Sequence, residues 1–185
     1  VGRRSGRDRM EPTLAVLNAL VDDGVIDQYA IGGAVAAIFW VEPFDTIDLD
    51  VFVLLPPAAH PLDPLRGVID ALAARGYSFE GELMAIEGVP VQFIPADDEA
   101  GLRKEALAEA SEHRYLDSVP TRIILPEYLI ALALEAHRAK DYERVFRLLT
   151  EIDVDRGKVG SLVERFGLQA QWEIFSRRYP EASVG

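Results

Sequence analysis

Two stretches decide the fold of this chain: Ile31-Gly32-Gly33-Ala34 and, after eleven intervening residues, Thr46-Ile47-Asp48-Leu49-Asp50-Val51-Phe52-Val53. Side chains of an extended strand alternate between its two faces. The carboxylates of Asp48 and Asp50 are therefore predicted to point to one face, while Leu49 points into the core. Two acidic groups converge on one place at the start of a strand.

The glycine pair joins the apolar run Tyr29-Ala30-Ile31 to a helix predicted over residues 34–41. A turn without Cβ atoms at the start of a helix lets backbone amides approach an anionic phosphate closely. A glycine turn beside paired carboxylates favours metal-assisted phosphoryl or nucleotidyl transfer.

An Asp-x-Asp pattern alone is weak evidence in a chain with 31 acidic residues, and Asp153-Val154-Asp155 is a second copy. The second copy precedes Arg156-Gly157 and is typical of a solvated turn. The first copy opens an apolar run over residues 51–55 that ends at Pro56-Pro57, which predicts a buried strand. The alternative remains that both acids cap this strand in water.

The order of these features resembles the polymerase-beta-like nucleotidyltransferase superfamily. The resemblance spans about residues 29–149: a Gly-Gly turn, a helix, Thr-x-Asp-x-Asp on a strand, a later strand and Lys140-Asp141. The closest likeness is to the small bacterial abortive-infection (AbiEii-like) toxin type. The resemblance implies that Asp48 and Asp50 bind Mg²⁺ or Mn²⁺, which bridges the triphosphate of a nucleoside triphosphate.

The same resemblance implies a set of residues that bind the phosphates of the nucleotide. Magnesium prefers oxygen ligands and usually keeps several waters, so a few carboxylates plus substrate phosphates suffice. The implied phosphate-binding residues are Gly32, Gly33, Thr46, Lys140 and Arg144.

Two departures from the family pattern bear on catalysis. The family's third acid lies on a later strand, matched here by residues 88–94, and its expected position holds Gln92. A neutral amide cannot act as the general base for an attacking hydroxyl. Glu87, Asp97 and Asp98 flank this strand as substitutes, and Ala34 stands where relatives often have a hydroxyl side chain.

Composition excludes several classes of protein. The chain has 185 residues, is 49% hydrophobic and contains no cysteine, so it forms a sizeable core without disulfides or thiolate metal sites. No apolar stretch approaches the roughly 18 residues of a membrane span, and no charged start leads into the apolar core of a signal peptide. We expect a cytoplasmic protein. A net charge of −12 disfavours broad RNA or DNA binding.

The predicted fold class is α+β (α/β), with a small mixed twisted sheet flanked by helices and a C-terminal helical portion. Residues 1–9, rich in arginine, are expected to be a leader that is disordered or vector-derived, with Met10 as the natural start. Residues 10–125 are expected to form the nucleotidyltransferase-like domain, and residues 126–185 a helical extension packed on it. The predicted elements are helices at 12–23, 65–75, 99–112, 126–136, 140–151 and within 158–179, and strands at 28–31, 77–86, 89–94 and 121–125.

The helix predicted at residues 140–151 has a basic face. At 100° per residue, Lys140, Arg144 and Arg147 share one side, and His137 extends it if this helix continues the preceding one. This face is either solvated or directed at the triphosphate. The sequence also leaves open whether Asp141 is a structural partner of a neighbouring amide or arginine.

The leading hypothesis is a metal-dependent nucleotidyltransferase that moves a nucleoside monophosphate to an unknown hydroxyl on RNA, a protein or a small molecule, in a toxin-antitoxin context. The alternative is a catalytically weakened relative that binds nucleotide or an antitoxin-like protein, which Gln92 favours. A third hypothesis is an interaction module whose acidic surface meets a basic partner.

Overall fold

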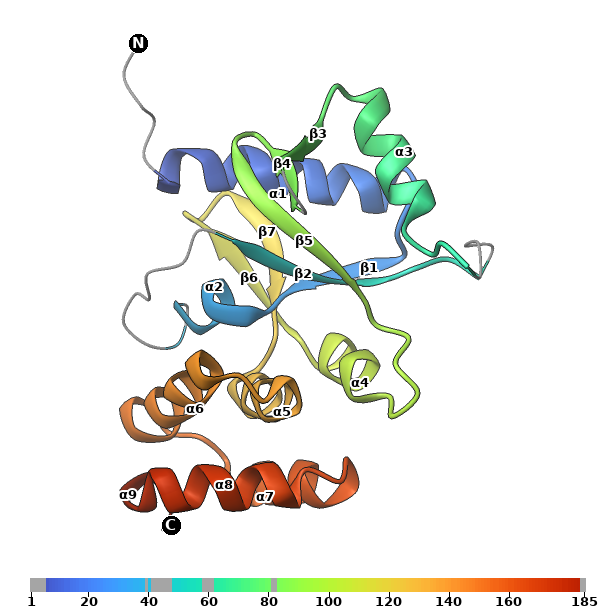
Figure 1. Cartoon of the computed structure of the whole chain (residues 1–185). Helices are drawn as coiled ribbons and strands as arrows, with labels where there is room; N and C mark the ends of the chain where they lie inside the picture. The colour runs from blue at the N-terminus through green and yellow to red at the C-terminus, as the bar shows by residue number, and fades with distance from the viewer. Residues whose placement is uncertain (1–5, 39, 41–47, 58–61, 81–82, 184–185) are drawn as a thin grey trace.

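A seven-stranded mixed β-sheet divides the helices of this protein into two groups, as seen in a computed structural model (Figure 1). The structure describes residues 6–38, 40, 48–57, 62–80 and 83–183. Within these ranges, α1 and α3 lie on one side of the sheet, and α2, α4, α5 and α6 lie on the other. Helices α7, α8 and α9 form an outer layer beyond α5 and α6. The predicted fold class, a mixed sheet flanked by helices, is confirmed.

The sheet has the strand order β3-β4-β5-β2-β1-β7-β6. Strand β2 is central, with β1 antiparallel on one side and β5 parallel on the other. Its neighbour β1 also pairs with β7 in parallel. The strands are β1 Gln28–Ile31, β2 Leu49–Leu54, β3 Ser78–Glu80, β4 Leu83–Ile86, β5 Val89–Pro95, β6 Ser111–Tyr115 and β7 Val119–Ile123.

The helices that the structure describes agree with most of the predicted positions. Helix α5 has the predicted bounds, because Pro126 fits the first helical position and a continuous apolar run follows it. The helices are α1 Gly6–Asp22, α2 Gly33–Ile38, α3 Arg66–Ala74, α4 Leu102–Ala108, α5 Pro126–Ala136, α6 Ala139–Glu151, α7 Arg156–Arg165, α8 Gln169–Arg178 and α9 Pro180–Ser183.

Helix α1 begins earlier than predicted. Its first residue is Gly6, so Pro12 lies inside the helix and not at its start. Proline inside a helix removes one hydrogen bond and crowds the preceding turn, which disfavours a continuous helix without forbidding it. Its apolar face is buried, with Leu14, Leu17 and Leu20 all in the core.

The helix predicted over residues 99–112 was wrong in its second half. Helix α4 ends at Ala108, and Ser111–Tyr115 forms the edge strand β6, paired with β7. The side chains of β6 alternate between half-buried and exposed, and most are polar, so no apolar period reveals the strand. The single strand predicted over residues 77–86 is instead two antiparallel strands, β3 and β4. Strand β4 then pairs with β5 through a two-residue turn in which Glu87 and Gly88 both have positive φ.

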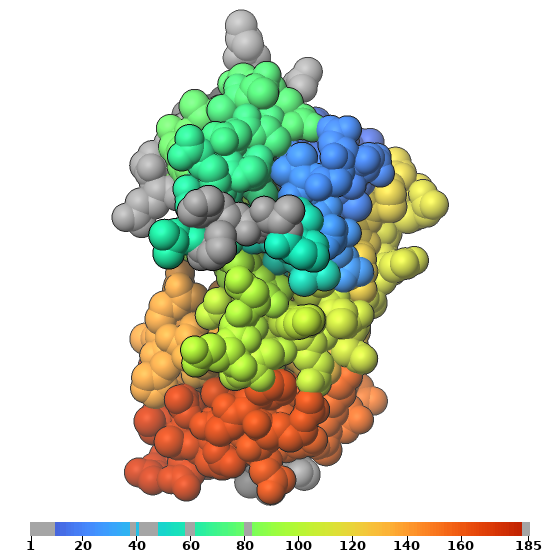
Figure 2. All heavy atoms as spheres, turned by 90° about the vertical axis from the view of Figure 1, so that its right-hand side faces the viewer, coloured from blue at the N-terminus to red at the C-terminus, as the bar shows by residue number. Residues whose placement is uncertain are grey.

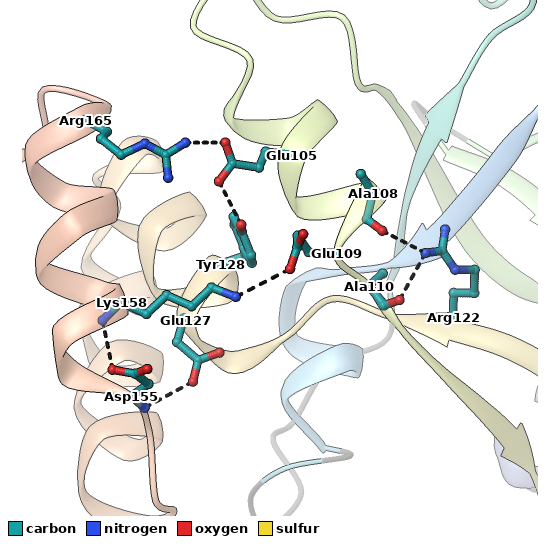
Figure 3. Close-up of polar contacts among 10 residues, drawn as sticks. All are labelled: Glu105, Ala108, Glu109, Ala110, Arg122, Glu127, Tyr128, Asp155, Lys158 and Arg165. Carbon is teal, nitrogen blue, oxygen red and sulfur yellow. Dashed lines mark hydrogen bonds and ion pairs between the residues drawn. The ribbon is translucent and has the colours of Figure 1, made fainter.

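Polar contacts join the outer helical layer to α4 and α5 (Figure 3). The carboxylate of Glu105 lies between Arg165, which donates to one oxygen, and the hydroxyl of Tyr128, which donates to the other at 2.8 Å. Nearby, Lys158 forms an ion pair with Glu109 at 3.7 Å. Figure 2 shows α4 lying directly against the C-terminal helices on this side of the molecule.

Aromatic packing fixes the same layer from within. Phe175 is fully buried, and its ring centroid lies 5.3–6.3 Å from those of Tyr142, Trp172 and Tyr179. Phe175 therefore belongs to the hydrophobic core. No described helix is both long and apolar enough to traverse a bilayer.

Candidate functional site

Strand β2 contains one of the two predicted acids, Asp50, and the other, Asp48, comes immediately before the strand. Leu49 and Val51 are completely buried, whereas Asp48 is exposed and Asp50 is half-buried. The negative charge of Asp48 contributes to the raised pKa of Asp50, so the two carboxylates lie within electrostatic range of each other. The two predicted acids thus lie near each other, one in β2 and one just before it.

The glycine turn packs directly against β2. The amide of Gly32 donates to the carbonyl oxygen of Asp50 at 2.9 Å, and Gly33 has a φ of +59°. A Cβ on Gly33 would lie 1.8 Å from Oδ2 of Asp50, and a Cβ on Gly32 would lie 2.3 Å from the ring of Phe52. Both glycines are therefore needed for the close approach of β2 side chains, a reason that the sequence pattern did not reveal.

Gln92 is the neighbour of Asp50 across the parallel pair formed by β2 and β5. Its side chain is exposed, and it lines the same cavity as Asp50. The residue expected to replace the third acid thus lies beside Asp50. Two of the three flanking acids have hydrogen-bond donors of their own: Glu87 accepts a hydrogen bond from Tyr77 at 2.7 Å, and Asp98 accepts one from the backbone of Arg103 at 3.0 Å.

A cavity of about 490 Å³ lies between the sheet and helices α5 and α6. Gly33, Asp50 and Gln92 line it from the sheet side, and Arg138 and Arg144 line it from the α6 side. Its volume is in the range of small-molecule sites, roughly 300–1,000 Å³. Carboxylate, amide and guanidinium groups therefore face one shared space.

The cationic wall of this cavity is built around Asp141, a completely buried residue in the first turn of α6. Arg138 binds its carboxylate with Nε at 2.6 Å from Oδ2, and Arg144 approaches with Nη1 at 3.4 Å from Oδ1. The side chain of Arg144 is only 11% exposed. Its Nε is buried and has no hydrogen-bond partner within the described part of the chain.

Charges across the cavity act on one another. Burial raises the pKa of Asp50, while the positive charges of Arg144, Arg138 and Lys140 oppose that rise. Burial lowers the pKa of Arg144, and the hydrogen bond to Asp141 raises the pKa of Arg138. The half-buried carboxylate therefore shares its cavity with Arg138 and Arg144 and lies within electrostatic range of Lys140.

The predicted site residues have different places in the structure. Arg144 lines the cavity, and Lys140 is exposed but close enough to influence the pKa of Asp50. Thr46 lies outside the described residues. His137 does not continue the basic face, because it ends α5 with a φ of +54° and separates the two helices.

Sequence reasoning missed Arg138 as a cavity residue. Arg138 precedes α6 in an extended conformation, so the helical period does not include it. The available signal was its spacing of three residues from Asp141, which suits an ion pair at the start of a helix.

The donor set of the site can be compared with what a divalent metal requires. Within the described ranges, no group of three or more His, Cys, Asp or Glu side chains could hold a metal ion. Magnesium is usually bound through one or two carboxylates together with substrate phosphates, not by an all-protein cage. Asp48 and Asp50 fit that mode, with the cationic residues across the cavity suited to the phosphates.

Comparison with known proteins shows the fold. No protein-family model matches the sequence, and no curated protein matches it either. The crystal structure of an antigenic nucleotidyltransferase-like protein from Paracoccidioides brasiliensis is similar, with a TM-score of 0.66 and 14% identity over 95% of this chain and 91% of that one. The solution structure of the antibiotic-resistance factor ANT(2'')-Ia has a TM-score of 0.52 and 17% identity over 94% of this chain and 99% of that one. The chain therefore has a nucleotidyltransferase-like fold.

Proposed function

We propose that this protein is a metal-dependent nucleotidyltransferase that transfers a nucleoside monophosphate from a nucleoside triphosphate to a hydroxyl acceptor. One observation supports the proposal most strongly. In a nucleotidyltransferase-like fold, the Asp50 carboxylate on the central strand shares a cavity with two guanidinium groups, Arg138 and Arg144.

Each group has a chemical role in this proposal. The carboxylates of Asp48 and Asp50 would hold Mg²⁺ or Mn²⁺, which would neutralise charge on the phosphates. The guanidinium of Arg144 and the ammonium of Lys140 bind phosphate oxygens, and Gly32, Gly33 and Thr46 belong to the proposed phosphate-binding segment. The acceptor oxygen forms a bond to the α-phosphorus as the bond to the leaving pyrophosphate breaks.

The proton of the acceptor hydroxyl must also be transferred to a base, and this requirement is the reason for an alternative function. A general base within hydrogen-bond reach would take that proton, but the amide of Gln92 has no basic site for it. Since Gln92 stands directly beside Asp50, the alternative is a protein of weakened catalysis that binds nucleotide or another protein.

The acceptor and biological context are the finer parts of the proposal. The sequence likeness to the abortive-infection toxin type suggests an antitoxin-like protein partner, and the net charge of −12 disfavours an extended RNA acceptor. Similarity to an antibiotic-resistance factor makes a small hydroxylated molecule the first acceptor class to test.

The experiment measures binding of ATP, CTP, GTP and UTP by calorimetry, with and without Mg²⁺. Asp48→Asn and Asp50→Asn should each lose the metal-dependent part of binding, because each removes a negative ligand. Asp153→Asn is a matched control from the second Asp-x-Asp copy and should bind like the wild type. Transfer of radiolabel from the bound nucleotide to small-molecule, RNA or protein fractions then separates catalysis from binding alone. Binding that is indifferent to Mg²⁺ and to both substitutions would overturn the proposal.

A further inference from the structure

Asp141 is the only carboxylate among the described residues that is completely buried. A buried ionised group is tolerated when it is paired and hydrogen-bonded. Arg138 meets this need with contacts of 2.6 Å and 3.4 Å to the two carboxylate oxygens, and Arg144 adds an ion pair at 3.4 Å. One acid on α6 therefore holds two guanidinium groups.

The same two arginines line the cavity that Asp50 lines, and their positive charges oppose the rise in the pKa of Asp50. Opposite charges attract strongly where water is partly excluded. Even so, none of the ion pairs within the described ranges involves Asp50, while both arginines pair with Asp141. The two guanidinium groups could thus pair with either Asp50 or Asp141, and in the structure both pair with the buried Asp141.

We propose that Asp141 is a positioning residue that holds Arg138 and Arg144 in the cavity wall and prevents them from pairing with Asp50. The carboxylate of Asp50 then stays available to a cation, and the arginines present their remaining N–H groups to a polyphosphate. The Nε of Arg144 is buried and has no hydrogen-bond partner in the described structure, so this arginine keeps an unused N–H group. This inference rests on the proposed function, because it assigns a role to Asp141 within that site.

The test uses inorganic tripolyphosphate with Mg²⁺ as the probe, since it contains the phosphate chain without a base or ribose. Calorimetry on the full chain gives two quantities: the Kd for tripolyphosphate and the Mg²⁺ concentration that gives half-maximal binding. In Asp141→Asn, arginines released from the buried acid should compete for Asp50. We expect tripolyphosphate to bind at least tenfold more weakly and the Mg²⁺ midpoint to rise at least fivefold.

Glu151→Gln is the matched control, because Glu151 also pairs with an arginine of α6, Arg147, but does not line the cavity. It should leave both quantities within twofold of the wild type. Urea unfolding establishes the folded fraction of each variant. A merely structural role for Asp141 would lower stability without moving the Mg²⁺ midpoint of the folded protein.

A second comparison does not depend on the folding of Asp141→Asn. The double variant Arg138→Gln/Arg144→Gln is compared with a triple variant that adds Asp141→Asn and so removes all three charges. If Asp141 acts only through the two arginines, the double and triple variants have the same tripolyphosphate affinity.

The outcomes separate this inference from the proposed function. A wild-type protein that fails to bind Mg²⁺ with either nucleotide or tripolyphosphate overturns both. Wild-type binding together with an unchanged Mg²⁺ midpoint in folded Asp141→Asn overturns the positioning role alone. A further loss of affinity in the triple variant relative to the double variant also overturns it.

Discussion

Replacing Gly33 with alanine tests whether the glycine turn sets the position of the Asp50 carboxylate. The new Cβ would lie 1.8 Å from Oδ2 of Asp50, whereas real Cβ contacts are essentially never shorter than 3.0 Å. The carboxylate or the turn must therefore move by at least 1.2 Å, the difference between these two distances. A displacement of about 1 Å at a reacting centre can reduce the rate about 100-fold, which corresponds to roughly 2.7 kcal/mol.

Alanine at this position also carries backbone strain, because Gly33 has a φ of +59°. The left-handed conformation costs an alanine about 1–2 kcal/mol. Gly24 supplies a matched control, since its φ is +68° and nothing lies within 4 Å of the place that a Cβ would occupy there. Gly24→Ala should lose similar stability from strain and keep the wild-type rate of pyrophosphate release.

The assay combines urea unfolding with the rate of pyrophosphate release from a nucleoside triphosphate with Mg²⁺. Gly33→Ala should release pyrophosphate about 100-fold more slowly than Gly24→Ala, although both variants fold. If Gly33→Ala is as fast as its control, the close contact does not position Asp50, and the reasoning about the turn is refuted.

Three further predictions concern other parts of the chain. Gln92→Glu should increase the rate of pyrophosphate release about 100-fold or more, the usual contribution of a general base, and Gln92→Asn is the control. An unchanged rate would show that Gln92 does not limit catalysis. The hydrogen bond from Arg165 lowers the pKa of Glu105, so the pair stabilises the fold above the usual carboxyl range and loses this effect as pH falls. Glu105→Gln should therefore lower the urea midpoint at pH 7 but not at a pH below the lowered pKa. A decrease that persists in acid would contradict stabilisation by the ionised Glu105. Phe175→Ala should cost about 3–5 kcal/mol in urea unfolding, because Phe175 is fully buried, whereas exposed Ile174→Ala should cost far less.

The sequence predicted local structure best where a single physical signal dominated. Strand β1 and helix α5 have the predicted bounds, and α6 begins one residue earlier than predicted. Each has a continuous apolar run or a strong apolar face. Strand β6 was missed because its polar side chains give no apolar period, and its pairing with β7 becomes visible only in three dimensions.

The residues of the candidate cavity could be predicted only in part from the sequence. Asp50 lines the cavity from β2, whereas Asp48 comes just before that strand and is not among the lining residues. Arg144 was selected from the helical period, but no period contains Arg138, which lies before the helix. Burial of Asp141 also depends on the layers packed around α6, so sequence alone left its role open.

The glycine turn shows how one sequence pattern can have two physical causes. The sequence suggested that the missing Cβ atoms make room for phosphate, yet the atoms nearest to those positions belong to Asp50 and Phe52. The two causes are compatible because they act at different atoms: the absent side chains admit β2, while backbone amides remain the groups suited to an anion. Packing of β2 against the turn is therefore sufficient to require both glycines, and support for phosphate binding has to come from the charged residues across the cavity.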